Sequence, residues 1–95
     1  MSNISELRPA ADHTRAARAA YVHDSLKAER WSVRAAALAI GITNSVLATR
    51  MNGTTAFLAD ELESIARLLK VDPVQFYAGY LAAGDPETPE VRPMD

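Results

Sequence analysis

Apolar residues recur along this chain at the three- and four-residue spacing of α-helices, and no segment alternates apolar and polar residues as a β-strand does. Ala19, Val22 and Leu26 form one such stripe in the first third of the chain. A second stripe, later in the chain, consists of Leu58, Leu62, Ile65 and Leu69. The pattern therefore predicts an all-α protein in which both stripes face the core.

Capping residues, glycines and prolines divide this pattern into five predicted helices. Asp12 or Thr14 caps the first helix, and the later caps are Ser32, Thr43 and Asp72. Gly41 ends the second helix in the left-handed conformation that glycine adopts freely. Asn52-Gly53 signals the turn that ends the third helix. The expected helices cover about 12–29, 32–40, 43–51, 57–69 and 73–83.

Length and composition fit one small domain. A chain of 95 residues, 48% of them apolar, can build a single modest core. We expect residues 1–11 to form a flexible N-terminal arm and residues 12–83 to form a compact five-helix domain. Residues 84–95 contain three prolines and four acids, which predicts a disordered acidic tail.

The last predicted helix is apolar on more than one side. Val74, Tyr77 and Leu81 follow a helical spacing and are expected to pack inward. Phe76 and Tyr80 would then lie together on an adjacent, exposed face. Exposed neighbouring aromatic rings indicate either a homodimer contact through this helix or a surface covered by the acidic tail.

Charge is unevenly distributed, although the formal net charge is only −2. Seven arginines and lysines accompany four acids between Met1 and Thr55, whereas three accompany eight between Ala56 and Asp95. A basic first half and an acidic second half suit a domain that offers one surface to a polyanion.

The chain lacks the residues that several classes of function need. The chain has no cysteine for disulfides or zinc, no signal peptide, and no apolar run long enough to cross a membrane. His13 and His23 are not aligned on their predicted helix. Acids that suit the first turns of a helix, where they favour its dipole, are Asp60, Glu61 and Glu63. We expect no enzymatic activity, no metal, no cofactor and no small-molecule ligand, and a cytoplasmic location.

The segment from Ala35 to Gly53, AAALAIGITNSVLATRMNG, gives the strongest indication of function. It predicts two short helices joined by a glycine turn, which is the arrangement of a helix-turn-helix whose second helix enters the major groove of DNA. Small or hydrogen-bonding residues share one face of that second helix: they are Asn44, Ser45, Ala48, Thr49 and Asn52. Such side chains read base edges through hydrogen bonds and methyl contacts.

The stretch from Trp31 to Tyr77 resembles the Cro and lambda-repressor type of helix-turn-helix proteins, found in phages and bacteria. The residues that carry this resemblance are Ser32, Ala37, Ile40-Gly41-Ile42-Thr43, Leu47, Asn52-Gly53, Ile65-Ala66, Leu68-Leu69 and Val71. The resemblance implies a lambda-repressor-like fold of five helices. It also implies a transcriptional repressor, such as a phage immunity repressor or a Cro-like regulator, whose partner is a double-stranded DNA operator.

The resemblance further implies which residues contact DNA. The implied base-contacting residues, all on helix 43–51, are Asn44, Ser45, Thr49 and, through its methyl group, Ala48. The implied phosphate-contacting residues, at the start of helix 32–40 and in the turn after helix 43–51, are Ser32, Val33, Arg34, Asn52 and Thr54. Two positions depart from the family pattern, with Val33 where Gln is usual and Arg50 where an apolar residue is usual.

Arg50 lies on the apolar side of the predicted recognition helix, between Val46 and Leu47. A lone buried guanidinium is very costly, so its head group must reach water or a carboxylate. It could extend to a DNA phosphate, or it could pair with Asp60 or Glu61 and brace the helix from behind. We favour the ion pair because those carboxylates closely follow the next turn.

One alternative function stays open. A protein-interaction module on the same fold, such as an antitoxin or an anti-repressor, does not need DNA. Three features of this chain would suit such a module: its weak basicity, the valine at position 33 and the acidic second half.

Overall fold

Five α-helices and their connections make up the part of the chain that the computed structural model describes, which is the backbone of residues 2–85 and the side chains of residues 13–85. The helices are α1 (Ser2–Ala28), α2 (Val33–Ile40), α3 (Asn44–Met51), α4 (Ala59–Leu69) and α5 (Pro73–Ala83). Within residues 2–85 there is no strand, so the all-α expectation is confirmed there.

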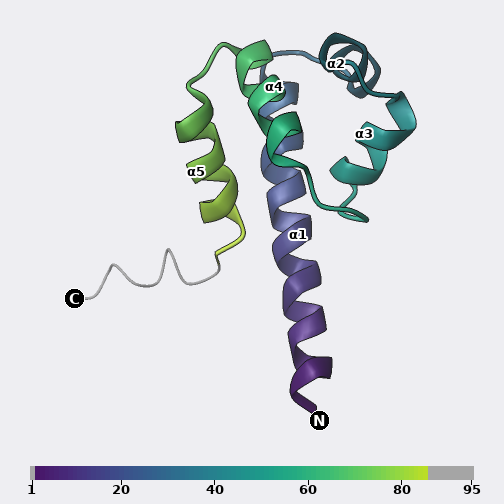
Figure 1. The fold of residues 1–95 in the computed structure, drawn as a ribbon, viewed down its shortest axis with the longest axis vertical. Helices are drawn as coiled ribbons and strands as arrows, with labels where there is room; N and C mark the ends of the chain where they lie inside the picture. The colour runs from purple at the N-terminus through teal and green to yellow at the C-terminus, as the bar shows by residue number, and fades with distance from the viewer. Residues whose placement is uncertain (1, 86–95) are drawn as a thin grey trace, which may run out of the picture.

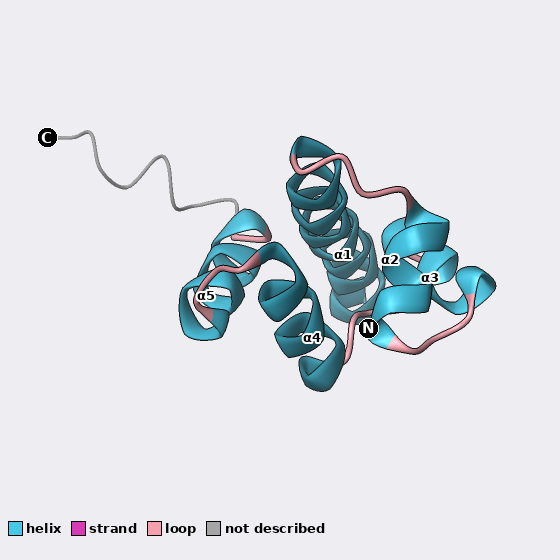
Figure 2. Ribbon diagram, turned by 90° about the horizontal axis from the view of Figure 1, so that it is seen from above, coloured by secondary structure: helices cyan, strands magenta, loops and turns pink. Residues whose placement is uncertain are grey.

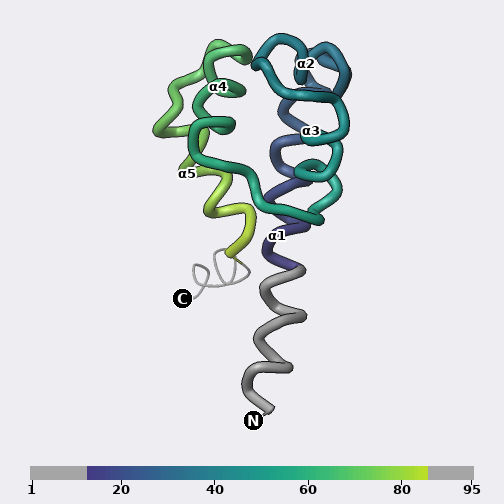
Figure 3. Tube along the Cα trace, turned by 45° about the vertical axis from the view of Figure 1, so that its right-hand side comes forward, coloured from purple at the N-terminus to yellow at the C-terminus, as the bar shows by residue number. Residues whose placement is uncertain are grey.

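The helices are arranged with α1 and α4 in the middle, α5 on one side, and the α2–α3 pair on the other (Figure 1, Figure 2). α1 packs against both α3 and α5, and α4 packs against both α2 and α5. The connection from α3 to α4 crosses α1 (Figure 3), where a Cβ at Gly53 would lie 3.4 Å from the Cα of Ala16. The outer helices α3 and α5 therefore lie on opposite sides of one core.

The two ends of the chain differ from the sequence expectation. α1 begins at Ser2 rather than at Asp12 or Thr14, so the backbone of residues 2–11 is helical instead of an arm. Pro9 lies within this helix, although a proline in a helix interior has no N–H to donate and its ring crowds the preceding turn, which is why the sequence favoured an arm. Gly84, where the tail was expected to begin, is buried in the domain. The rest of the expected tail, residues 86–95, lies outside the described residues.

Local sequence signals set the other helix ends. The hydroxyl oxygens of Ser32 and Thr43 and the carboxylate of Asp72 each accept a hydrogen bond from the third residue of the helix that follows. Gly41, with φ of 84°, ends α2 in the left-handed conformation. These caps and this glycine were all predicted from the sequence.

α4 begins two residues later than predicted, and this changes which side chains face the core. Leu58 precedes the helix, donates its N–H to the Glu61 side chain at 2.9 Å, and is 57% exposed. Phe57 is buried in its place, with Leu62 and Ile65. The prediction of Leu58 as a core residue was wrong because the chain is extended at that position and no longer follows the helical period.

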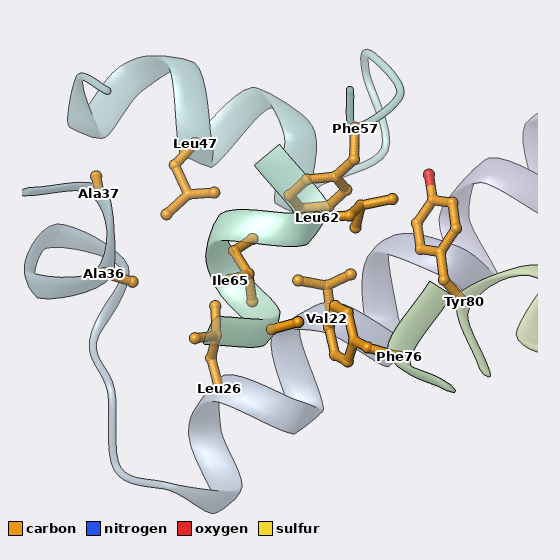
Figure 4. Close-up of a cluster of buried hydrophobic side chains, with 11 residues drawn as sticks. Val22, Leu26, Ala36, Ala37, Leu47, Phe57, Leu62, Ile65, Phe76 and Tyr80 are labelled. Carbon is orange, nitrogen blue, oxygen red and sulfur yellow. The ribbon is translucent and has the colours of Figure 1, made fainter. Parts of the chain in front are cut away.

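The core consists of side chains from all five helices and from the segment before α4 (Figure 4). Val22, Leu26, Leu47 and Ile65 are its fully buried large side chains. Aromatic rings extend it towards α5, where Phe57 and Tyr80 meet edge to face with centroids 6.2 Å apart. The predicted α1 stripe of Ala19, Val22 and Leu26 is confirmed as buried.

α5 packs through the adjacent face and not through the one that we predicted. Phe76 and Tyr80 are each only 5% exposed, whereas Val74, Tyr77 and Leu81 are exposed. The prediction was wrong because both faces carry helically spaced apolar residues, so periodicity alone does not choose between them. On the buried face, Gly79 lies against Tyr21 of α1, whose hydroxyl donates to the Phe76 carbonyl at 3.2 Å, and a Cβ at Gly79 would overlap that hydroxyl.

Candidate nucleic-acid interface

A tight turn at Gly41 holds α2 and α3 together. The N–H groups of Gly41 and Ile42 both donate to the carbonyl of Ala37, at 2.9 and 3.0 Å. A Cβ at Gly41 would meet nothing within 4 Å, so glycine is needed there for its positive φ and not for space. Thr43 follows as the cap of α3, and Leu47 fixes α3 to the core with no exposed surface.

α3 turns its polar residues away from the core, as the sequence predicted. Asn44 and Ser45 are exposed, and Ala48 and Thr49 are partly exposed. Asn52, just after the helix, is also exposed. The structure therefore brings the four candidate base-reading residues, together with the candidate phosphate contact Asn52, to one accessible surface without assigning them a ligand.

The hydroxyl of Thr49 is already engaged within its own helix. It donates to the carbonyl of Val46 at 2.8 Å. Its oxygen can still accept a hydrogen bond, and its methyl group can still make apolar contacts. Any base edge that Thr49 reads in this rotamer must therefore offer a donor or a methyl group.

The turn after α3 is organised around the side chain of Asn52. Its Oδ1 accepts hydrogen bonds from the Thr54 N–H at 2.9 Å and from the Thr54 hydroxyl at 2.6 Å. The amides of Thr54 and Thr55 also reach the carbonyl of Thr49, at 3.1 and 3.3 Å. The donors of Thr54 are thus used inside the turn. Because Oδ1 is used in this way, the Nδ2 group of the exposed Asn52 side chain is the donor that is left for a ligand.

The N-terminus of α2 offers backbone donors next to a positive charge. The Ser32 hydroxyl oxygen accepts from the Ala35 N–H at 3.1 Å, so its own proton is free to point outward. The amides of Val33 and Arg34 belong to the first turn, which has no intrahelical acceptor for them. The Val33 side chain packs against the core, so only its backbone can take part in binding.

Arg30 lies just before this helix and was not singled out from the sequence. It is exposed and adopts a left-handed conformation with φ of 66° in the turn between α1 and α2. Arg34 is exposed as well, four residues later. The signal that could have found Arg30 is its position two residues before the Ser32 cap.

Arg50, the residue that fitted the sequence pattern worst, forms an ion pair with Glu61. Arg50 Nε donates to Glu61 Oε1 at 2.8 Å, and Nη2 donates to Oε2 at 3.0 Å. A third guanidinium nitrogen, Nη1, donates to the Thr55 hydroxyl at 2.8 Å. Glu61, one of the two carboxylates named from the sequence, also accepts the Leu58 N–H. One carboxylate thus connects α3, the following turn and the start of α4.

Burial and hydrogen bonding act in opposite directions on Glu61. Burial alone would raise the pKa of this carboxyl group. The hydrogen bonds from Arg50 and from the Leu58 N–H, together with the Arg50 charge, outweigh burial and hold the pKa below its ordinary value. The hydrogen bond to Glu61 in turn raises the pKa of Arg50. The pair is therefore fully ionised near neutral pH.

The other chemical candidates form no metal-binding cluster among the described side chains. His13 and Asp60 are exposed, and Glu63 pairs with Arg67 at 2.8 Å. Among the described side chains, no three of His, Asp or Glu lie close enough together to hold a metal ion. None of the described helices is both long enough and apolar enough to cross a membrane.

Comparison of the chain with protein-family models, with curated proteins and with solved structures finds no match. Its function must therefore be argued from the geometry of the α2–α3 unit and its surroundings.

Proposed function

We propose that this protein is a sequence-specific double-stranded DNA-binding regulator, a repressor of the Cro or lambda-repressor kind, in which α3 reads an operator in the major groove. The observation that carries the proposal is the α2–Gly41–α3 unit. Leu47 anchors α3 to the core while Asn44 and Ser45 remain exposed. A helix fixed on one side and lined by small polar groups on the other suits base-edge recognition.

The phosphate contacts in this proposal flank α3 on two sides. The first-turn amides of α2, with the Ser32 hydroxyl and the exposed Arg34, form one donor set. The Nδ2 group of Asn52 forms the other, because the Thr54 donors are used inside the turn. Arg30 is added to the first set as a long-range positive charge. Such backbone contacts fix the register of α3 on the duplex.

The pairing of Arg50 makes this residue a brace rather than a DNA contact in the proposal. Its guanidinium is held by both oxygens of Glu61 on the side of α3 that faces α4. A phosphate contact would require the bidentate pair to open, which would leave the Glu61 carboxylate without its charge partner.

A homodimer is the second part of the proposal, now through the face of α5 that the structure leaves exposed. Val74, Tyr77 and Leu81 form this face, and a groove of about 640 Å³ between α4 and α5 adjoins it. Glu63 and Arg67 lie in the groove wall with opposite charges. A two-fold axis can therefore pair each with its opposite on the second copy. Apolar surface of this kind also suits a protein partner, which is the remaining alternative to DNA binding.

Titration with a mixed-sequence duplex over a range of salt concentrations tests the proposal first. We expect weak binding that falls steeply with salt, since each phosphate contact adds about one unit to the logarithmic salt slope. Selection of bound sites from a random duplex pool should then return one sequence, bound much more tightly. If the protein dimerises, that site should be a palindrome with half-site centres about 34 Å apart.

Two results would count against these proposals. Protection of no sequence at any protein concentration below aggregation, together with salt-insensitive behaviour, would remove DNA binding and leave the interaction module. A monomer in sedimentation at high concentration, both free and on DNA, would reject the dimer while leaving the DNA-binding proposal in place.

A further inference from the structure

The polar face of α3 carries hydrogen-bond donors at both of its ends. Asn44 and Ser45, in the first turn, are exposed and carry an amide and a hydroxyl donor. Asn52, the candidate phosphate contact just after the helix, keeps its Nδ2 group as a donor. Ala48 and Thr49 lie between these ends, and both are partly exposed. The middle of the face is therefore formed by Ala48 and Thr49.

This middle turn offers methyl groups and an acceptor to a ligand, and its side chains have no free donor. The Ala48 side chain is a methyl group. The Thr49 hydroxyl proton is already used, because the hydroxyl donates to the Val46 carbonyl at 2.8 Å. Thr49 therefore presents a methyl group and an oxygen that only accepts. Turning the proton towards a base would break the hydrogen bond to Val46, whereas accepting from a base leaves that bond in place.

The bases differ in what they offer to such a surface in the major groove. Guanine offers only acceptors, N7 and O6, which methyl groups and an accepting oxygen cannot satisfy. An acceptor that loses water without gaining a donor is costly. Cytosine offers a donor at N4 but no methyl group. Only the A·T pair carries both a donor, at adenine N6, and a methyl group, on thymine.

We propose that the operator carries an A·T pair where the middle of α3 meets the major groove, and that Thr49 is the residue that specifies this pair. The Thr49 oxygen accepts a hydrogen bond from adenine N6, while the methyl groups of Thr49 and Ala48 pack against the thymine methyl group. The assignment of this pair rests on the proposed DNA-binding function and adds the chemistry of one operator position to it. Asn44 and Ser45 remain available to read neighbouring pairs.

Selection of bound sites with the unchanged protein and with two variants locates the pair. The unchanged protein should return A·T at the position that Thr49 reads. Thr49→Ala should relax the preference at that position and leave the preferences at the other positions. Ser45→Ala, a change on the same face one turn earlier, is the matched control and should relax a different position.

Two base analogues at that position then test the two parts of the contact. Uracil in place of thymine removes only the methyl group and should weaken binding by about fourfold. 2-Aminopurine in place of adenine removes the N6 donor from the major groove and should weaken binding by about fivefold. Thr49→Val keeps methyl groups but lacks the accepting oxygen, so it should retain the response to uracil and lose the response to 2-aminopurine. The same replacements outside the selected site are the control and should change nothing.

Several results would overturn the assignment of the pair and leave DNA binding in place. One is a G·C pair at the position that Thr49→Ala relaxes, and another is a selection in which Thr49→Ala relaxes no position. Equal binding of the unchanged protein to thymine and uracil, or to adenine and 2-aminopurine, would also overturn it. So would a response of Thr49→Val to 2-aminopurine as large as that of the unchanged protein. Failure to select any sequence would instead remove the proposed function itself, and the assignment of the pair with it.

Discussion

α3 and α5 each bury one face in the same core, yet they present opposite chemistry on the other face. α3 exposes the polar side chains of Asn44 and Ser45, whereas α5 exposes Val74 at 75% and Tyr77 at 45%. Exposed polar groups need no partner, because water already satisfies them. An exposed apolar face gains free energy when another surface covers it. The α3 side of the molecule therefore suits a hydrated ligand such as DNA, and the α5 side suits protein association.

The largest effect on stability is expected from substitutions within α5. Phe76→Ala should lower the free energy of unfolding by about 3–5 kcal/mol, because it removes a ring from the core. Tyr77→Ala, one residue later, should cost less than about 1 kcal/mol in the monomer because its ring is half exposed. Urea unfolding at low protein concentration measures both.

The same pair of variants separates packing from association. Tyr77→Ala should weaken self-association in sedimentation, and it should leave the fold intact. Equal destabilisation of the monomer by both variants would mean that Tyr77 belongs to the core, and the assignment of the two faces would be wrong.

The next test concerns the ion pair behind α3. Arg50→Met should lower the free energy of unfolding by about 2–3 kcal/mol, since the buried Glu61 carboxylate loses its charge-assisted hydrogen bonds. Affinity for the cognate site should change little under conditions where the protein stays folded. Weaker binding to all duplexes, with a salt slope lower by about one unit, would instead make Arg50 a phosphate contact.

The polar face of α3 is tested by its specificity. Asn44→Ala should cost about 1–3 kcal/mol on the selected site and little on random DNA. Thr49→Ala should do the same, whereas Thr49→Val keeps a methyl group and should retain any thymine contact. Equal losses on both kinds of DNA would show that these residues contact phosphate or support folding.

The smallest expected effect is a loss of folding stability at acidic pH. The folded pKa of Glu61 is lowered, so its contribution to stability is complete above the ordinary glutamate pKa of about 4.3 and is lost as the pH falls through the lowered value. Glu61→Gln should be less stable than the unchanged protein at pH 7, and the difference should shrink below about pH 4.3. Urea titrations from pH 7 to pH 3 measure it, and a constant difference would contradict the assignment.

Much of the candidate interface follows from local sequence signals. The caps at Ser32 and Thr43 and the left-handed Gly41 lie where predicted, because each depends on only a few neighbouring residues. The polar face of α3 was also predicted. Leu47 points into the core, and helical periodicity then places the polar residues of α3 on the side that faces away from it. The sequence also favoured an ion pair of Arg50 with Asp60 or Glu61, because a guanidinium on an apolar face needs a nearby acid, and the structure shows that the partner is Glu61.

What the sequence by itself determined is the approximate course of the helices from α2 to α5 and the residues on the outward face of α3. Capping, glycine conformation and helical periodicity are short-range effects, so the local sequence specifies them. Only the tertiary structure decided which face of α5 is buried and that Arg18 lies beneath the end of that helix. Both depend on the close approach of α5 to α1 at Gly79 and Gly84, residues more than fifty positions away from Tyr21 and Thr14 along the chain. Steric fit between such distant residues leaves no periodic pattern in the sequence.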